Sequence, residues 1–223
     1  MALSRLRRDP VSGQWVIVSE GRHHRPSDYA SADDARPRNA REPECAFCPG
    51  NEARTPPALL TVPGDGPWRV RAFANKYPAV TADGAPGQAD ALYEERPALG
   101  HHEVIVESPA HDQRLSELDA AQWAAVLGAY RARLAHHAAA GSAYTLLFKN
   151  EGRRAGASLA HPHAQLMTLP RVPDRIAAEF AAARAHRARH GRNLFEQLVE
   201  RELDDGRRVV GHNDAILACA PFA

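Results

Sequence analysis

Residues 144–169 read YTLLFKNEGRRAGASLAHPHAQLMTL, and the expected fold and the expected site both start from this stretch. Two β-prone runs, 144–149 and 163–169, flank a loop at 150–158 that contains two glycines. β-Branched and aromatic residues favour extended backbone, and glycines mark the loop between them. We therefore predict a strand, a glycine-containing loop and a second strand that begins at His163.

Outward from this stretch, the sequence predicts an antiparallel sheet with helices packed on it. A helix is expected at 116–140, where Ser116 is a candidate N-cap and Gly141 suits the left-handed position after the last turn. A second helix, 173–203, is expected to break near Gly191. Further strands are expected at 14–18, 68–73, 102–107, 207–210 and 215–218, and the stretches 20–64 and 81–99 are expected to be loops. The turn-like residues 211–214 favour antiparallel pairing, so we predict the α+β class and treat residues 1–223 as one domain.

The composition indicates a globular protein of a reducing compartment. The 223 residues are 44% hydrophobic and 25% charged, with a net charge of +1, which argues against a disordered chain and against a strongly basic nucleic-acid binder. No run of 18 apolar residues occurs, and the N-terminus has no apolar signal segment, so we expect no membrane association. With three cysteines, two of them in one Cys-x-x-Cys, we expect the cytoplasm rather than a secreted disulfide scaffold.

The densest chemical signal is His161-Pro-His163-Ala-Gln165. Proline at the start of a strand fixes the backbone between the two histidines, which suits a site where one imidazole binds and the other reacts. Upstream, Gly152 and Gly156 would let backbone N–H groups approach a phosphate. The alternative interpretation is a polar edge strand with incidental histidines.

A second signal is Cys45-Ala-Phe-Cys48. Two thiolates in one tight turn can chelate a metal ion, and Zn²⁺ would need two further ligands. The candidates are His101, His102, His111 and His161. The alternatives are two buried thiols or a redox pair, although a redox motif normally opens a helix in a βαβ unit.

Other polar residues give weaker signals. Arg22 and Arg25 follow a strand and are candidates for a phosphate clamp, with a solvated basic turn as the alternative. Cys219 is expected to be a buried small hydrophobe. Four histidines are expected at the surface of helices: His136, His137, His186 and His190.

Several of these motifs together resemble one protein family. The segment 161–165, preceded by 150–152 and 156–158, is similar to the active-site segment of the galactose-1-phosphate uridylyltransferases, in the histidine-triad superfamily. Further segments resemble that family in its order along the chain: 8–15, Arg22 with Arg25-Pro26, 45–52, 55–57, 75–78 and 102–111. The resemblance implies a histidine-triad-like antiparallel sheet with helices packed on it.

The resemblance also implies a role for each matching residue. His163 would be the nucleophile that takes a uridylyl group from UDP-glucose and passes it to galactose 1-phosphate. Zn²⁺ would be held by Cys45, Cys48, His111 and His161, and four protein ligands imply a structural ion. Phosphate contacts would come from Asn150, Gly156, Ser158 and Gln165, and nucleotide or sugar-phosphate contacts from Arg22, Arg25 and Asn75.

The sequence also departs from the family. The family usually has a second half after the position of residue 223, which this sequence does not include, and the resemblance implies a homodimer that completes the site. Lys76 and Ala157 stand where the family often has an acidic residue and a cysteine. Two alternative functions stay open: a nucleoside-diphosphate-sugar phosphorylase that uses the same histidine, and a zinc-stabilised nucleotide-binding module without turnover.

Overall fold

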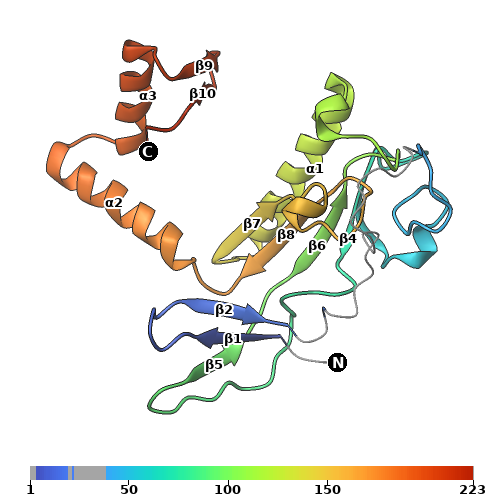
Figure 1. Ribbon diagram of the computed structural model, residues 1–223, viewed down its shortest axis with the longest axis horizontal. Helices are drawn as coiled ribbons and strands as arrows, with labels where there is room; N and C mark the ends of the chain where they lie inside the picture. Colours follow the sequence, from blue (N-terminus) through green and yellow to red (C-terminus); the bar gives the residue numbers. More distant parts are fainter. Residues whose placement is uncertain (1–3, 20–21, 23–38, 223) are drawn as a thin grey trace. The chain divides into compact units, whose positions relative to one another are not determined.

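A computed structural model describes residues 4–19, 22 and 39–222 of the chain (Figure 1). Contacts group the chain into two compact units, Met1–Arg171 and Val172–Ala223. The predicted phosphate ligand Arg25 lies outside the described residues. That residues 1–223 form one domain stays a prediction.

The first unit is built on a five-stranded sheet. Its strand order is β3 (Ala58–Val62), β4 (Val70–Ala74), β6 (His102–Val106), β8 (His163–Leu169) and β7 (Tyr144–Phe148). Every neighbouring pair in this sheet is antiparallel. The predicted α+β class is therefore confirmed, and so are the strands expected at 144–149 and 163–169.

One face of this sheet is covered by helix α1 (Ala120–Ala139), as Figure 1 shows. Alternation along the strands sends Ala72 and Ile105 to this face, where they pack with Val126 and Ala129 of the helix. The expected cap was wrong: α1 begins after Asp119, whose side chain accepts a hydrogen bond from the Gln122 N–H, so Ser116 precedes the helix.

The opposite face of the sheet carries the aromatic residues that matter for the site. Phe73 of β4 and Val104 of β6 pack there with Phe47, from the segment that contains both cysteines of the Cys-x-x-Cys. Residues 20–64 were expected to be loop throughout, yet they contain β3 and the short 3₁₀ helix Glu52–Arg54.

A second, three-stranded sheet in this unit has the order β2 (Trp15–Val18), β1 (Arg5–Arg8) and β5 (Glu94–Pro97). We predicted β2 but not β1 or β5, because both missed strands are dominated by charged residues. Cross-strand ion pairs between them, such as Arg7 with Glu95 at 2.8 Å, let these charges pair at the surface. Their apolar face packs around Leu6, Val80 and Ala98.

The second unit consists of helices α2 (Asp174–His190) and α3 (Leu194–Asp205) and a hairpin of β9 (Val209–His212) and β10 (Leu217–Cys219). The helix break near Gly191 is confirmed, since Gly191 ends α2 with φ of 70°. Among the described residues, no helix combines the length and apolar character that crossing a bilayer demands.

Two minor predictions were wrong. Cys219 is exposed, because β10 belongs to a two-stranded hairpin that covers little surface. His137 is buried with 3% of its surface exposed, because it lies one turn beyond Arg133 on the face of α1 that meets Glu103 of β6.

Candidate active site and cysteine–histidine cluster

Four predicted ligands from three distant segments come together in the structure. One ligand atom from each of Cys45, Cys48, His111 and His161 lies within 4.8 Å of all the others. The cysteines sit in a tight turn, and His111 is held against this segment by its backbone N–H, which donates to the Ala40 carbonyl at 2.9 Å. His101 and His102, which the sequence left open as ligands, lie outside this cluster.

The distances within the cluster fit one tetrahedral ion. The Cys48 sulfur lies 3.6 Å from Nδ1 of both His111 and His161, and the Cys45 sulfur lies 3.7 Å from Nδ1 of His161. Usual Zn–S and Zn–N bond lengths around a tetrahedral zinc place sulfur and nitrogen about 3.6 Å apart.

The electrostatics of the cluster also suit a cation. Burial, and to a smaller degree the neighbouring Cys48, raises the pKa of the Cys45 thiol to about 12. A thiolate here therefore requires a positive charge beside it. Burial lowers the pKa of His161 to about 4, so its ring is neutral at pH 7. Its Nε2–H donates to the Ser108 carbonyl at 2.8 Å, which leaves Nδ1 as the ligand atom.

His163, the predicted nucleophile, lies beside this cluster at the start of β8. Only 8% of its surface is exposed. Its Nδ1 lies 2.8 Å from the carbonyl oxygen of His161, so Nδ1 carries the proton and donates it. The lone pair of the neutral ring is then on Nε2. The side chain of His161 belongs to the cluster, and its backbone carbonyl thus fixes the tautomer of His163, the predicted nucleophile.

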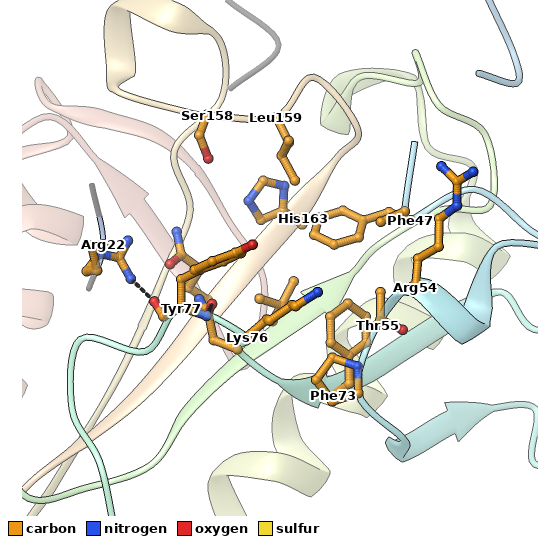
Figure 2. Close-up of a pocket in the computed structure, with 15 residues that line it drawn as sticks. Arg22, Phe47, Arg54, Thr55, Phe73, Lys76, Tyr77, Ser158, Leu159 and His163 are labelled. Carbon is orange, nitrogen blue, oxygen red and sulfur yellow. Dashed lines mark hydrogen bonds between the residues drawn. The ribbon is translucent and has the colours of Figure 1, made fainter. Parts of the chain in front are cut away.

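His163 opens onto a pocket lined by both polar and apolar side chains (Figure 2). Figure 2 shows its imidazole next to the ring of Phe47, with a ring-centroid distance of 5.3 Å. The apolar lining comes from Ala46, Phe47, Pro56, Phe73, Val104 and Leu159. The polar lining comes from Arg22, Arg54, Thr55, Asn75, Lys76, Tyr77, Ser158 and Gln165.

The pocket gathers most of the predicted binding residues. Arg22 reaches it from the N-terminal segment and donates from Nη1 to the Tyr77 carbonyl at 2.7 Å. Asn75, Ser158 and Gln165 also line it. Asn150 and Gly156 are not among the described residues that line the pocket, although Gly156 has φ of 80°, which requires glycine in the turn at 152–157.

The sequence reasoning missed the aromatic part of the pocket. Phe47 and Phe73 lie on segments 26 residues apart and meet edge to face at 5.5 Å between ring centroids. Arg71 stacks over Phe73 and donates to the Thr55 hydroxyl at 2.6 Å, which fixes this end of the pocket. Phe73 breaks the alternation of 68–73, because it falls on the same face as Arg69 and Arg71, and nothing local pairs it with Phe47.

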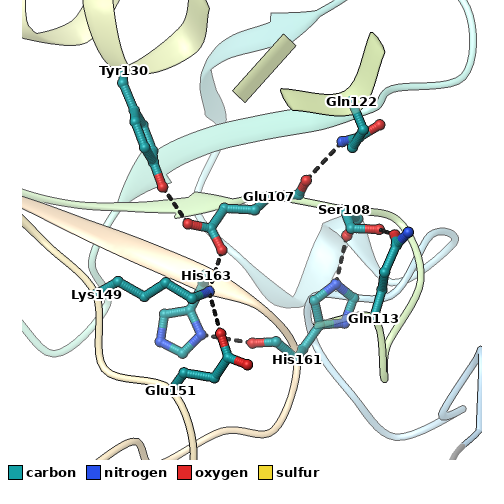
Figure 3. A network of polar contacts seen from close by, with 9 residues as sticks. All are labelled: Glu107, Ser108, Gln113, Gln122, Tyr130, Lys149, Glu151, His161 and His163. Carbon is teal, nitrogen blue, oxygen red and sulfur yellow. Dashed lines mark hydrogen bonds and ion pairs between the residues drawn. The ribbon is translucent and has the colours of Figure 1, made fainter. Parts of the chain in front are cut away.

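A buried polar network supports the same segment from behind (Figure 3). The Glu107 carboxylate is fully buried and accepts hydrogen bonds from the Tyr130 hydroxyl and the Lys149 ammonium. The Glu107 backbone N–H donates to the Pro162 carbonyl at 3.1 Å. The end of β6 thus holds the backbone on which both histidines sit.

Comparison with known proteins agrees with the resemblance drawn from the motifs. A family model described as Galactose-1-phosphate uridyl transferase, N-terminal domain, matches residues 1–173. The chain is 33% identical to ADP-glucose phosphorylase of Arabidopsis thaliana, over 98% of this chain and 62% of that protein. It is 29% identical to galactose-1-phosphate uridylyltransferase of Neurospora crassa, over 99% of this chain and 66% of that protein.

A solved structure of a uridylyltransferase superposes with a TM-score of 0.73 at 34% identity, and covers 98% of this chain and 62% of that chain. This chain therefore spans less than two thirds of the length of each of these relatives.

Proposed function

Because the chain belongs to the galactose-1-phosphate uridyl transferase family, we propose that it moves UMP from UDP-glucose to galactose 1-phosphate through a uridylyl group held on His163. The observation that carries this proposal is the contact of His163 Nδ1 with the His161 carbonyl. With the proton on Nδ1, the lone pair of His163 is on Nε2. An imidazole needs such a lone pair to act as a nucleophile, and His163 lines the pocket.

Two displacements at phosphorus make up the reaction. The Nε2 lone pair forms a bond to the α-phosphorus of UDP-glucose, and the bond from that phosphorus to the bridging oxygen breaks, so glucose 1-phosphate leaves as an anion. The ring then carries a positive charge, which the Nδ1–H shares with the His161 carbonyl. A phosphate oxygen of galactose 1-phosphate next attacks the same phosphorus, and the N–P bond breaks to return the neutral ring.

The pocket supplies charge where this chemistry develops it. Phosphoryl transfer depends mainly on positioning and on stabilising charge at the phosphate oxygens. Arg22 and Lys76 bring positive charge, and Ser158 and Gln165 bring hydrogen-bond donors. We propose that Asn75, Asn150, Gly156 and Arg25 complete the contacts to nucleotide and phosphates, and that the apolar region around Phe47 and Phe73 holds the base.

We propose zinc as the ion of the cysteine–histidine cluster. Cys45, Cys48, His111 and His161 would hold it, and with four protein ligands it would supply structural stability. The four ligands would thereby connect the turn 45–48 to the backbone at residue 161, and this connection would hold His163 at the pocket.

A phosphorylase is the second candidate, and the 33% identity to ADP-glucose phosphorylase favours it. The same histidine would then take AMP from ADP-glucose, and inorganic phosphate would be the acceptor. The first displacement has the same chemistry in both functions. The two functions therefore differ in the acceptor of the nucleotidyl group and in the nucleobase of the donor.

The test is a comparison of two donors and two acceptors. UDP-glucose and ADP-glucose, each labelled in the nucleotidyl phosphate, are incubated with the protein, and label on denatured protein is counted. We expect label that is lost in His163→Ala. Release of the label by galactose 1-phosphate supports the transferase, and release by inorganic phosphate supports the phosphorylase. A protein that takes up no label from either donor is a binding module, and the proposal is then wrong.

We also propose that the protein works in the cytoplasm as a homodimer. The cytoplasm is supported by a cysteine pair arranged for a metal rather than a disulfide. Self-association is supported by exposed apolar residues of the second unit, which include Val210, Ile216 and Phe222.

A further inference from the structure

His102 is a buried imidazole that contacts two pocket residues, Asn75 and Gln165, and that neither the cluster nor the proposed chemistry uses. It lies in β6, with 5% of its surface exposed. In the register of β6 and β8 it pairs with Met167, so Gln165 is its diagonal neighbour on the same face of the sheet. Its Nε2 lies 3.0 Å from Oε1 of Gln165.

The backbone determines which nitrogen of His102 carries the proton. The Ala79 N–H, which can only donate, lies 2.9 Å from Nδ1 of His102, so Nδ1 is an acceptor. Burial lowers the pKa of His102 to about 4, with a smaller effect from the positive charge of Arg22, so the ring is neutral at pH 7. A neutral ring with an accepting Nδ1 carries its hydrogen on Nε2.

The tautomer of His102 in turn determines the orientation of the Gln165 amide. A donating Nε2–H requires an acceptor at 3.0 Å, and the acceptor of a glutamine amide is its oxygen. The NH₂ end of Gln165 therefore points away from His102, and it makes no hydrogen bond to any residue in the described part of the chain. Since Gln165 lines the same pocket as His163, its two N–H donors are available to a ligand there.

The neighbouring Asn75 is oriented in the same way. Its Oδ1 accepts from the Tyr77 N–H at 2.8 Å, which leaves Nδ2 on the side of His102, 3.3 Å from Nε2. Because Nε2 already carries a hydrogen, it cannot accept from Asn75. The amide hydrogens of Asn75 are thus also available to a ligand in the pocket that both residues line.

We infer that His102 is a positioning residue, which holds the Gln165 amide with its N–H donors toward the phosphate of a bound nucleotide. This inference rests on the proposed function, because it assigns those donors to the phosphate that His163 attacks. A flipped amide would instead direct a carbonyl oxygen at phosphate oxygens, where it would repel negative charge. The ring of His102 prevents that flip.

The test compares two substitutions of His102 that differ in one donor. His102→Gln keeps an N–H near the position of Nε2, and His102→Leu removes it. In single-turnover labelling at saturating donor, we expect His102→Leu to slow label uptake by about 10-fold to 100-fold, and His102→Gln to remain within about threefold of the original. The donor concentration at half-saturation should change much less than the rate.

A double-mutant cycle separates positioning from a general structural effect. We expect His102→Leu, Gln165→Ala and the double variant to label at rates within about threefold of one another, because each removes the same oriented donor. Independent, multiplicative losses would overturn the inference. The matched control is His137→Gln, a buried histidine that contacts Glu103 on the other face of the sheet, and it should label at the original rate.

A readout that needs no turnover keeps this inference separate from the proposed function. Ring ¹⁵N–¹H correlation spectra should show His102 as the Nε2–H tautomer at pH 7, and UMP or AMP should shift the side-chain NH₂ signals of Gln165 in the original chain but not in His102→Leu. If the original protein takes up no label, the proposed function fails, while these spectra still decide the inference. An Nδ1–H tautomer, or Gln165 signals that respond equally in both proteins, would overturn it.

Discussion

At the scale of single residues, the two histidines around Pro162 have separable parts. His161 presents Nδ1 to the cluster, whereas His163 faces the pocket. We predict that His163→Ala abolishes covalent labelling and keeps the metal content, and that His161→Ala loses the metal. Elemental analysis of both variants, alongside the label count, checks this. Equal metal loss in the two would contradict the assignment.

A pH dependence of stability follows from the buried ring of His102. Its pKa is about 4 in the folded chain and near 6.5 in an unfolded one, so between these values the unfolded state binds more protons. The stability that the neutral His102 ring contributes is therefore fully present above pH 6.5 and is lost as the pH falls toward 4. We expect this residue to contribute a loss of about 2 kcal/mol between pH 7 and pH 5.

Urea unfolding at the two pH values measures this loss. The neighbours of His102 here are Arg22, Asn75, Ala79 and Gln165, of which only Arg22 is charged. His102→Gln cannot titrate, so its stability should depend less on pH by the same amount. An unchanged dependence would mean that other groups are responsible.

At the scale of elements, the cluster joins the turn at 45–48 to the ends of β6 and β8. If the proposed zinc is bound there, its removal should release this turn, including the pocket residue Phe47, and should leave the backbone that holds His163 less well fixed. We predict one zinc per chain in protein purified without chelator, and a loss of labelling on chelation that added zinc restores. Protein that labels at full rate without metal would show that the cluster does not position the nucleophile.

Another contact between elements joins α1 to β6. Glu103 is buried and accepts two hydrogen bonds from Arg133, at 2.8 and 2.6 Å, and it lies 2.7 Å from His137. Glu103→Gln leaves the Arg133 charge without its partner, and removal of one member of a buried pair costs about 3 to 5 kcal/mol. We expect the free energy of unfolding to fall by this amount and the Tm to fall with it, with the labelling rate of the folded fraction unchanged. A Tm equal to the original would show that water compensates the arginine.

At the scale of the whole molecule, exposed apolar side chains predict self-association. Val210, Ile216 and Phe222 have 80%, 67% and 84% of their surface exposed. Surfaces of this kind are usually covered by a partner. We predict a dimer or larger species in sedimentation at micromolar concentration, and a shift toward monomer when the three are changed to serine. A monomer before any substitution would refute the prediction.

The features that could be predicted from the sequence are those set by residues close together in the chain, and the features that were missed depend on residues far apart in it. The strands 144–148 and 163–169 and the helix break at Gly191 follow from local periodicity and glycine, and all three were predicted. Strands β1 and β5 were missed because charged residues dominate their sequences and hide the apolar face, which becomes apparent only when the strands pair and pack around Leu6, Val80 and Ala98. The buried His137 was missed because its partner Glu103 is 34 residues away. The metal-cluster residues were found through the family resemblance, whereas local reasoning left four histidines as possible ligands.

Strand β6 works as a template for the segment 161–163. Val106 pairs with His163, the Glu107 N–H donates to the Pro162 carbonyl, and the Ser108 carbonyl accepts from the His161 ring, so three successive residues at and just after the end of β6 hold three successive residues at and just before the start of β8. Deleting one residue from 103–108 would therefore shift His163, Pro162 and His161 together. For anyone grafting or recombining this scaffold, a crossover inside β6 would disturb the site, whereas the exposed turn at 63–67 between β3 and β4 is a safer place for one.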